Sequence, residues 1–260
     1  MLLSELLPDK PVAPVFIKGI CEDSRMVQQG DLFCAIKGLQ ADGRDHISAA
    51  IRNGAAAILG EAPFSRPSKP LVPIYEVEGL RWRISEIAGR FYGNPSEKLS
   101  VFAVTGTNGK TSFTQFMAQA LWAVKIKAGM IGTMGSGMPG ALEEAGLTTP
   151  SAINIQRKLR EFLDAGVNAV ALEASSHGLV QGRLSNVNVE TAILTNITHD
   201  HLDYHGSFEE YRKAKEKLFH IKSVRNAIIN IDDDFAPTLM ANLGDAVRVV
   251  GFSLKKATDV

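Results

Sequence analysis

The sequence predicts an α/β protein in which a small N-terminal α/β domain precedes a domain with a mostly parallel, doubly wound sheet. Two observations carry this prediction. Beyond residue 100, short apolar segments alternate with amphipathic helical segments, as in parallel sheets covered by helices. The Gly-Asn-Pro-Ser cluster within Tyr92–Ser100 has the composition of a linker and separates this region from an earlier one. We therefore expect two domains, residues 1–95 and 96–260.

The region before the linker contains its own strand and helix patterns. We expect strands at Asp31–Ile36 and Ala55–Leu59. Helical spacing of apolar residues predicts helices at His46–Asn53, with Gly54 as a C-cap, and at Leu80–Phe91. This combination indicates a small α/β domain.

The region after the linker alternates strands and helices. The expected strands are Val101–Val104, Gly129–Ile131, Ala169–Leu172, Ala192–Leu194 and Ala227–Ile231. The expected helices are Thr111–Val124, Ser151–Asp164 and Phe208–His220. In the first helix we expect one apolar face made of Phe113, Phe116, Met117, Ala120, Leu121 and Val124. Ligands of such sheets bind beyond the carboxyl ends of the strands, so site residues should follow each strand.

Composition excludes several functional classes. Lys plus Arg and Asp plus Glu both total 28, so the chain lacks the basic surplus of a general nucleic-acid or anionic-membrane binder. Cys21 and Cys34 are too few for a disulfide framework and form no C-x-x-C pair, so we expect free thiols. The N-terminus does not resemble a signal peptide, and no apolar run is long enough to span a membrane. We expect a cytoplasmic protein.

A shortened phosphate-binding loop follows the first strand of the second region. A usual P-loop reads G-x-x-x-x-G-K-S/T, whereas here only Thr107 and Asn108 separate Gly106 from Gly109. The glycines allow a tight turn, and the following helix directs its positive end at an anion. Lys110 is placed to reach the terminal phosphates. The alternative is an ordinary strand–turn–helix connection with a chance Gly-Lys-Thr.

Two further strand ends carry candidate site residues. Glu173 follows Ala169–Leu172, where a carboxylate is well placed to hold a metal, although a helix cap or a surface acid remains open. The segment after Ala192–Leu194 contains His199, His201 and His205 without a His-Glu-x-x-His zinc motif. We expect His199 and His205 to be solvated loop residues and His201 to contact a metal or a phosphate.

Lys215 is an unusual residue on the expected helix Phe208–His220, because it shares a face with apolar side chains. It lies four residues after Tyr211 and three before Leu218. Such a lysine either extends its charge to solvent along its stem or is buried, in which case its pKa falls and its amine becomes nucleophilic. The spacing alone leaves both possibilities open.

Taken together, these motifs resemble the Mur ligases nearly end to end. The residues that carry the resemblance are Asp23-Ser24-Arg25, Gly30–Phe33, Gln40–Arg44, Thr105–Thr111, Thr148-Thr149-Pro150, Glu173–Leu184 and Asp200–Gly206. The Asp-Tyr-His-Gly run in the last segment favours the branch that adds the third amino acid of the peptidoglycan stem over the branch that adds D-Ala-D-Ala.

The resemblance implies an ATP-dependent amide ligase that acts through an acyl phosphate in peptidoglycan synthesis. It implies ATP and Mg2+ as cofactors, and UDP-N-acetylmuramoyl-L-alanyl-D-glutamate and an amino acid, meso-diaminopimelate or L-lysine, as partners. ATP contacts are implied for Thr105, Gly106, Thr107, Asn108, Gly109, Lys110 and Thr111. Metal ligands are implied at Thr111, Glu173 and His201, and a carbamylated lysine at Lys215. Lys110, Lys215, His201 and Glu173 would form the catalytic set. Contacts to the UDP-muramyl dipeptide are implied for Ser24, Gln40, Ala41, Thr148, Thr149, Ser175, Gln181 and Arg183.

Members of this family are much longer than 260 residues. We therefore expect an incomplete central ATP-binding domain, no amino-acid-binding domain, and no ligation by this piece alone. The alternatives are a non-catalytic module that binds nucleotides or nucleotide sugars, another Mur-type or folylpolyglutamate-type ligase, and a P-loop kinase acting on a small acid. We expect a monomer without nucleic-acid or membrane partners.

Overall fold

A computed structural model describes residues 1–38, 41–64, 70–144 and 146–255. The described chain separates into two compact units, Met1–Asn94 and Pro95–Val260. Both are α/β units with parallel strands, so the predicted fold class is confirmed. Among the described residues, no helix has the length and apolar character needed to cross a membrane.

The first unit contains a four-stranded parallel sheet in the order β1-β2-β3-β4. Strand β2 is buried along its whole length, and Phe33 and Ile58 lie in the core that α2 covers. The four predicted elements are present, and β1 and β4 are additional. The bounds are α1 Leu3–Leu6, β1 Gly19–Cys21, β2 Asp31–Ala35, η1 Gly43–His46, α2 Ile47–Arg52, β3 Ala57–Glu61, β4 Ile74–Val77 and α3 Leu80–Tyr92.

The second unit contains an eight-stranded sheet in the order β12-β11-β10-β5-β9-β6-β7-β8. The strands from β12 to β6 are parallel, and β7 and β8 add an antiparallel end. The strand bounds are β5 Ser100–Thr105, β6 Ala128–Gly132, β7 Gly135–Met138, β8 Ala141–Glu143, β9 Ala169–Glu173, β10 Thr191–Leu194, β11 Asn226–Asn230 and β12 Arg248–Phe252. The helix bounds are η2 Pro95–Lys98, α4 Lys110–Ala123, α5 Ala152–Asp164, α6 Ser176–Val180, α7 Leu202–His205, α8 Phe208–Glu216, η3 Lys217–His220 and α9 Ala236–Ala241.

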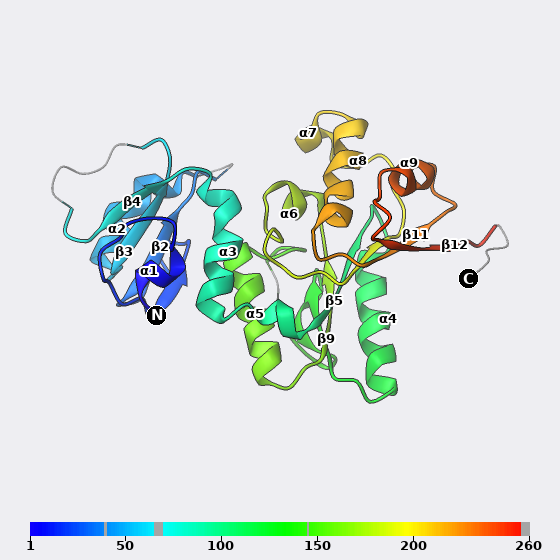
Figure 1. Ribbon diagram of the computed structural model, residues 1–260, viewed down its shortest axis with the longest axis horizontal. Coiled ribbons are helices and arrows are strands. Elements are labelled where there is room, and N and C mark those ends of the chain that lie inside the picture. The colour runs from blue at the N-terminus through cyan, green and yellow to red at the C-terminus, as the bar shows by residue number, and fades with distance from the viewer. Residues whose placement is uncertain (39–40, 65–69, 145, 256–260) are drawn as a thin grey trace. The chain divides into compact units, whose positions relative to one another are not determined.

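Helices cover both faces of this second sheet, so its central strands β6 and β9 are buried along their whole length (Figure 1). Along β6, Met130 packs in the α4 cluster and Ile131 packs in the larger core with α5. Gly129 has no side chain because Phe162 of α5 would lie 2.7 Å from a Cβ there. The strand order reverses around β5, and in open α/β sheets the ligand crevice lies outside the carboxyl ends of the strands at such a point.

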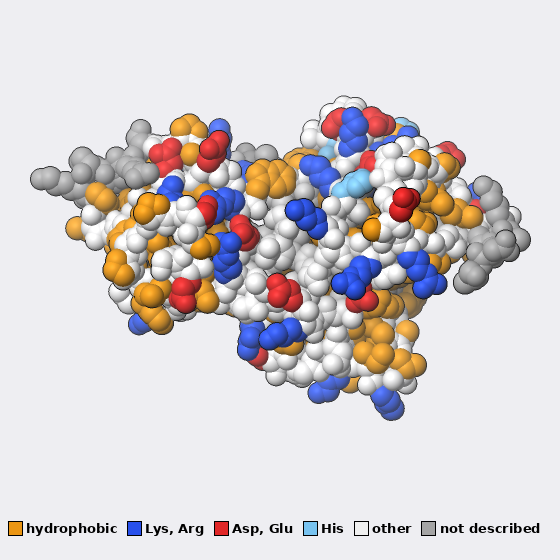
Figure 2. Space-filling model, in the orientation of Figure 1, with side chains coloured by type: hydrophobic (Ala, Val, Ile, Leu, Met, Phe, Trp, Pro, Cys, Tyr) orange, Lys and Arg blue, Asp and Glu red, His pale blue; other side chains and the backbone are white. Residues whose placement is uncertain are grey.

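The expected apolar face of the first helix is wrong for Phe116, Ala120 and Val124, which are exposed, whereas Phe113, Met117 and Leu121 are half-buried. The fully buried residues of α4 are Thr114 and Ala118, whereas Phe116 is 70% exposed and Val124 is 66% exposed. Small residues at the centre of the buried face let the helix approach β6 and β9 closely, and Leu121 packs beside them, while Phe116 faces outward. Figure 2 shows apolar side chains at the surface where Figure 1 places α4.

Candidate functional site

The phosphate-binding loop connects β5 to α4 at the point where the strand order reverses. Gly106 and Gly109 have backbone φ values of 151° and 85°, which residues other than glycine rarely adopt. Gly109 is the N-cap of α4, and no side chain in the described part of the chain caps this helix. The first N–H groups of a 14-residue helix therefore face the crevice, as in anion-binding sites.

Two lysines converge on the carbonyl oxygen of Gly106. Lys110 Nζ donates to Gly106 O at 2.8 Å and to Thr107 O at 2.9 Å. Lys215 Nζ, which comes from α8, donates to the same Gly106 O at 2.7 Å. The structure thus brings these two predicted site residues together beside the loop. Burial lowers the pKa of Lys110, and the nearby charges of Glu173 and Asp200 oppose this shift.

Lys215 is buried, with 2% of its surface exposed, and does not extend to solvent. Its Nζ lies 4.4 Å from the centre of the Tyr211 ring, and the Tyr211 hydroxyl lies 3.1 Å from Thr107 Oγ1 in the loop. Burial, followed by repulsion from Lys110, lowers the pKa of Lys215 to about 7. A substantial fraction of this amine is therefore neutral at neutral pH, which is the nucleophilic form.

Glu173 lies at the end of β9, and 1% of its surface is exposed. Thr111 Oγ1 donates to Glu173 Oε2 at 3.0 Å, which joins the carboxylate to the start of α4. Thr133 donates to it from N at 2.9 Å and from Oγ1 at 3.1 Å. Because β6 pairs with β9, Gly132 lies beside Glu173, and a Cβ there would be 2.2 Å from Oε1. The carboxylate is therefore held in one position.

The donors around Glu173 fit a magnesium ion better than a transition metal. In the described ranges, no three His, Cys, Asp or Glu side chains are grouped to hold a metal ion. A carboxylate with the hydroxyl of Thr111 beside it is nevertheless the oxygen set that Mg2+ uses, since Mg2+ keeps several waters and takes few protein ligands.

His201 lies in a cluster of rings rather than alone in a loop. Its ring is 5.0 Å from that of His177 and 6.4 Å from that of Tyr211, and its Nε2 is 3.5 Å from Asp200 Oδ2. Burial lowers the pKa values of His177 and His205, and neighbouring histidine charges add to this effect.

The expectation of a solvated loop residue is wrong for His205. This residue ends α7 and is half-buried, and its Nε2 lies 3.0 Å from Ser176 Oγ. His199 is exposed and stacks on Phe208 with ring centres 4.1 Å apart.

The substrate candidates of the second unit form one hydrogen-bonded series. Thr148 Oγ1 lies 3.0 Å from Thr133 Oγ1, and Thr149 Oγ1 donates to Glu173 O at 2.7 Å. Ser175 N donates to Thr149 Oγ1 at 2.9 Å. Arg183 donates to Gln181 Oε1 and to the carbonyl of Thr149.

The remaining substrate candidates belong to the first unit. Ser24 is buried, and its carbonyl accepts from Asn53 Nδ2 at 2.8 Å. Ala41 is exposed. Gln40 lies outside the described residues.

Several residues that contact the site were not predicted to have a role. Thr133 donates to Glu173, Tyr211 contacts Lys215 and the loop, and Asn196 binds the loop backbone. Tyr211 was counted only as part of an apolar face. The signal for Asn196 was its position two residues after the end of β10, the strand next to β5 in the sheet.

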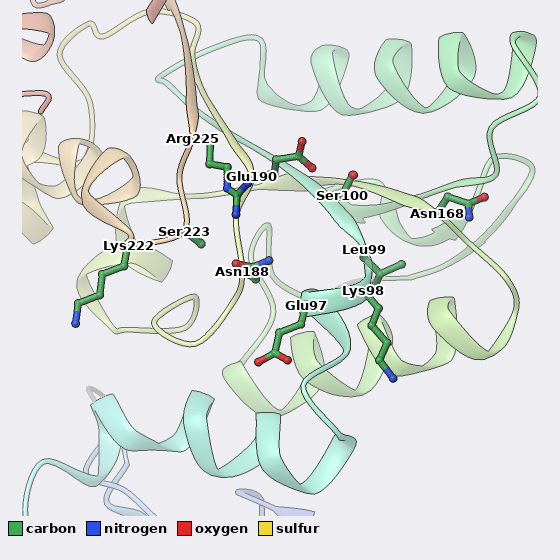
Figure 3. A pocket seen from close by; sticks show the side chains of 10 residues that line it. All are labelled: Glu97, Lys98, Leu99, Ser100, Asn168, Asn188, Glu190, Lys222, Ser223 and Arg225. Atoms are coloured by element: carbon green, nitrogen blue, oxygen red, sulfur yellow. The ribbon is translucent and has the colours of Figure 1, made fainter. Parts of the chain in front are cut away.

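A hollow of about 480 Å3 lies at the opposite end of the same sheet from the phosphate-binding loop. It is lined by residues before β5, β9, β10 and β11, among them Lys98, Lys222 and Arg225. In Figure 3 the side chains of Lys98 and Lys222 point away from one another. These charges do not converge, so the carboxyl-end crevice is the better candidate.

Two protein families match the chain. One, described as the Mur ligase middle domain, matches residues 104–260, and the other, described as Mur ligase family, catalytic domain, matches residues 16–92. The UDP-N-acetylmuramoyl-L-alanyl-D-glutamate--2,6-diaminopimelate ligase of Ectopseudomonas mendocina is 47% identical over 262 residues, which cover 99% of this chain and 53% of that protein. The chain thus spans about half the length of the curated relatives it matches.

Solved structures share the fold. A structure described as UDP-N-acetylmuramoyl-L-alanyl-D-glutamate--2,6-diaminopimelate ligase superposes with a TM-score of 0.87 at 32% identity, covering 99% of this chain and 53% of that one. The MurF ligase from Thermotoga maritima in complex with ADP has a TM-score of 0.61 at 21% identity, covering 94% and 52% of the two chains.

Proposed function

Because this chain belongs to the Mur ligase family, we propose that it binds ATP and forms part of a ligase that joins an amino acid to UDP-N-acetylmuramoyl-L-alanyl-D-glutamate. The names of its relatives favour 2,6-diaminopimelate as that amino acid. The product would be a cytoplasmic precursor of peptidoglycan.

One observation carries the proposal. The loop before α4 meets Lys110, Lys215 and the Thr111–Glu173 pair at a single edge of the sheet. The Lys110 side chain and the uncapped N-terminus of α4 favour a polyphosphate, and a buried carboxylate beside a hydroxyl favours its Mg2+. This combination suits phosphoryl transfer, where catalysis is positioning and charge stabilisation.

The reaction proceeds in two steps. A carboxylate oxygen of the muramyl dipeptide attacks the γ-phosphorus of ATP, the bond to the bridging oxygen breaks, and an acyl phosphate and ADP form. The amino group of the incoming amino acid then attacks the acyl carbon, loses a proton, and expels inorganic phosphate. Lys110 and the first N–H groups of α4 hold the phosphates during the first step. Bound Mg2+ would neutralise phosphate charge, with Thr111, Glu173 and His201 as its protein contacts.

Lys215 is the proposed carbamylation site. Its neutral amine adds to CO2, and loss of one proton leaves a carbamate. The carbamate would replace a buried cation by an anion next to Lys110, which removes the repulsion between the two ammonium groups. The proposed contacts to the UDP-muramyl dipeptide are Ser24, Gln40, Ala41, Thr148, Thr149, Ser175, Gln181 and Arg183.

Calorimetric titration with ADP and Mg2+ tests the proposal. Wild-type protein should bind ADP, and Lys110→Ala should weaken binding at least tenfold, because a partly buried charge-assisted contact is lost. Lys125→Ala, an exposed lysine after the same helix, is the matched control and should bind as the wild type does. Addition of UDP-N-acetylmuramoyl-L-alanyl-D-glutamate distinguishes a ligase from a small-acid kinase, because only the ligase binds this compound. Failure of the wild type to bind ADP would refute the proposal.

A further inference from the structure

The phosphate-binding loop is two residues shorter than a usual P-loop, and another segment supports it. Strand β10 runs parallel to β5, with Leu194 beside Thr105 in the register. The next residues, Thr195 and Asn196, therefore continue alongside the loop. Thr195 N donates to Thr105 O at 3.1 Å, so the ladder of the sheet extends one residue past the end of β10.

Asn196 makes three hydrogen bonds to the loop backbone. Its carbonyl oxygen accepts from Thr107 N at 2.7 Å. Its side-chain amide pairs with both backbone groups of Asn108, since Oδ1 accepts from Asn108 N at 3.0 Å and Nδ2 donates to Asn108 O at 3.1 Å. In a β-sheet, a neighbouring strand supplies one C=O and one N–H to the backbone N–H and C=O of a residue. The Asn196 side chain supplies the equivalent two groups to Asn108.

Gly106 and the segment Thr195-Asn196 pack closely together beside this pairing. A Cβ on Gly106 would lie 1.9 Å from Thr195 Oγ1 and 3.0 Å from Asn196 O. Thr195 Oγ1 also donates to Asn108 O at 2.6 Å. The segment is itself fixed from the far side, because Asn230 Nδ2 of β11 donates to Thr195 O at 2.8 Å.

We infer that Asn196 is a positioning residue that completes the shortened loop and confines phosphate binding to the N–H groups at the start of α4. The N–H groups of Thr107 and Asn108 donate to Asn196 and are unavailable to a ligand. Those of Gly109, Lys110 and Thr111 remain for the phosphates. This inference rests on the proposed function, in which the loop holds ATP.

Asn196→Ala tests the inference through two measurements. Loss of two side-chain hydrogen bonds should speed hydrogen exchange at the Asn108 amide and weaken ADP binding, each by about tenfold. The control is Asn226→Ala, which removes an amide bonded to Thr191 Oγ1 at the opposite end of the sheet. If Asn196 has only a structural role, both variants should have a lower thermal midpoint than the wild type, and both should bind ADP as the wild type does.

The outcomes separate this inference from the proposed function. If Lys110→Ala weakens ADP binding and Asn196→Ala binds within twofold of the wild type, the inference is wrong and the proposed function stands. If the wild type binds no ADP, the proposed function fails, and the exchange rate of the Asn108 amide still decides whether Asn196 holds the loop. Should Asn196→Ala not fold, Thr195→Val replaces it. That variant should weaken ADP binding severalfold, Thr195→Ser should restore it, and equal binding by both would overturn the inference.

Discussion

Replacing Lys215 with methionine should remove much of the pH dependence of stability above neutral pH. Lys215 is 2% exposed, and burial lowers its pKa from 10.5 to about 7. The folded state therefore binds fewer protons than the unfolded state between these two values, and the free energy of unfolding rises with pH across that interval. Below pH 7 the lysine is charged in both states, and the destabilisation from burying an ammonium is complete.

The size of this effect follows from the pKa difference. Between pH 7 and pH 9, Lys215 should raise the free energy of unfolding by about 2 kcal/mol. Urea unfolding of the wild type and of Lys215→Met at both pH values measures this contribution. The buffers must be purged of CO2, because carbamate formation would remove the amine. Lys217→Met, at an exposed lysine on the same segment, should respond to pH as the wild type does. Equal pH responses in wild type and Lys215→Met would refute the reasoning.

Three other substitutions test the packing around the loop and α4. Glu173→Gln leaves at least one donor without an acceptor and removes a charge, so stability should fall by about 1–2 kcal/mol and Mg2+ should improve ADP binding less than in the wild type; an unaltered Mg2+ effect in calorimetry would contradict this. Gly106→Ala should cost about 2 kcal/mol in urea unfolding, because its Cβ overlaps Thr195 Oγ1, and a loss below about 0.5 kcal/mol would show that the segment yields. Phe116→Ser should change stability by less than about 0.5 kcal/mol, since the ring is 70% exposed; a larger fall in the thermal midpoint would mean that the ring is covered.

The sequence was informative where chemistry is local. The strand, glycine turn and helix around Lys110 lie in one short segment, and each follows from backbone rules for glycine and for helix N-termini. The inward position of Lys215 follows from helical spacing, and Ser207, whose side chain accepts from Glu210 N, marks the start of its helix.

Other features depend on contacts that spacing does not encode. The face of α4 was partly misassigned, because close packing on the sheet buries Thr114 and Ala118 most deeply and leaves Phe116 exposed. Strand β7 was missed because its sequence, Gly-Ser-Gly-Met, lacks the branched apolar residues typical of strands. The contacts of Asn196 were not predicted, since they require knowing that β10 lies beside β5.

Tyr211 touches the loop with one end and the buried amine with its face. Its hydroxyl lies 3.1 Å from Thr107 Oγ1, and its ring centre lies 4.4 Å from Lys215 Nζ. Nucleotide entering the crevice and CO2 reacting with the amine would therefore alter different parts of one aromatic side chain. Nucleotide binding and carbamate formation should therefore shift different NMR signals of the Tyr211 ring, which would reveal the order of the two events.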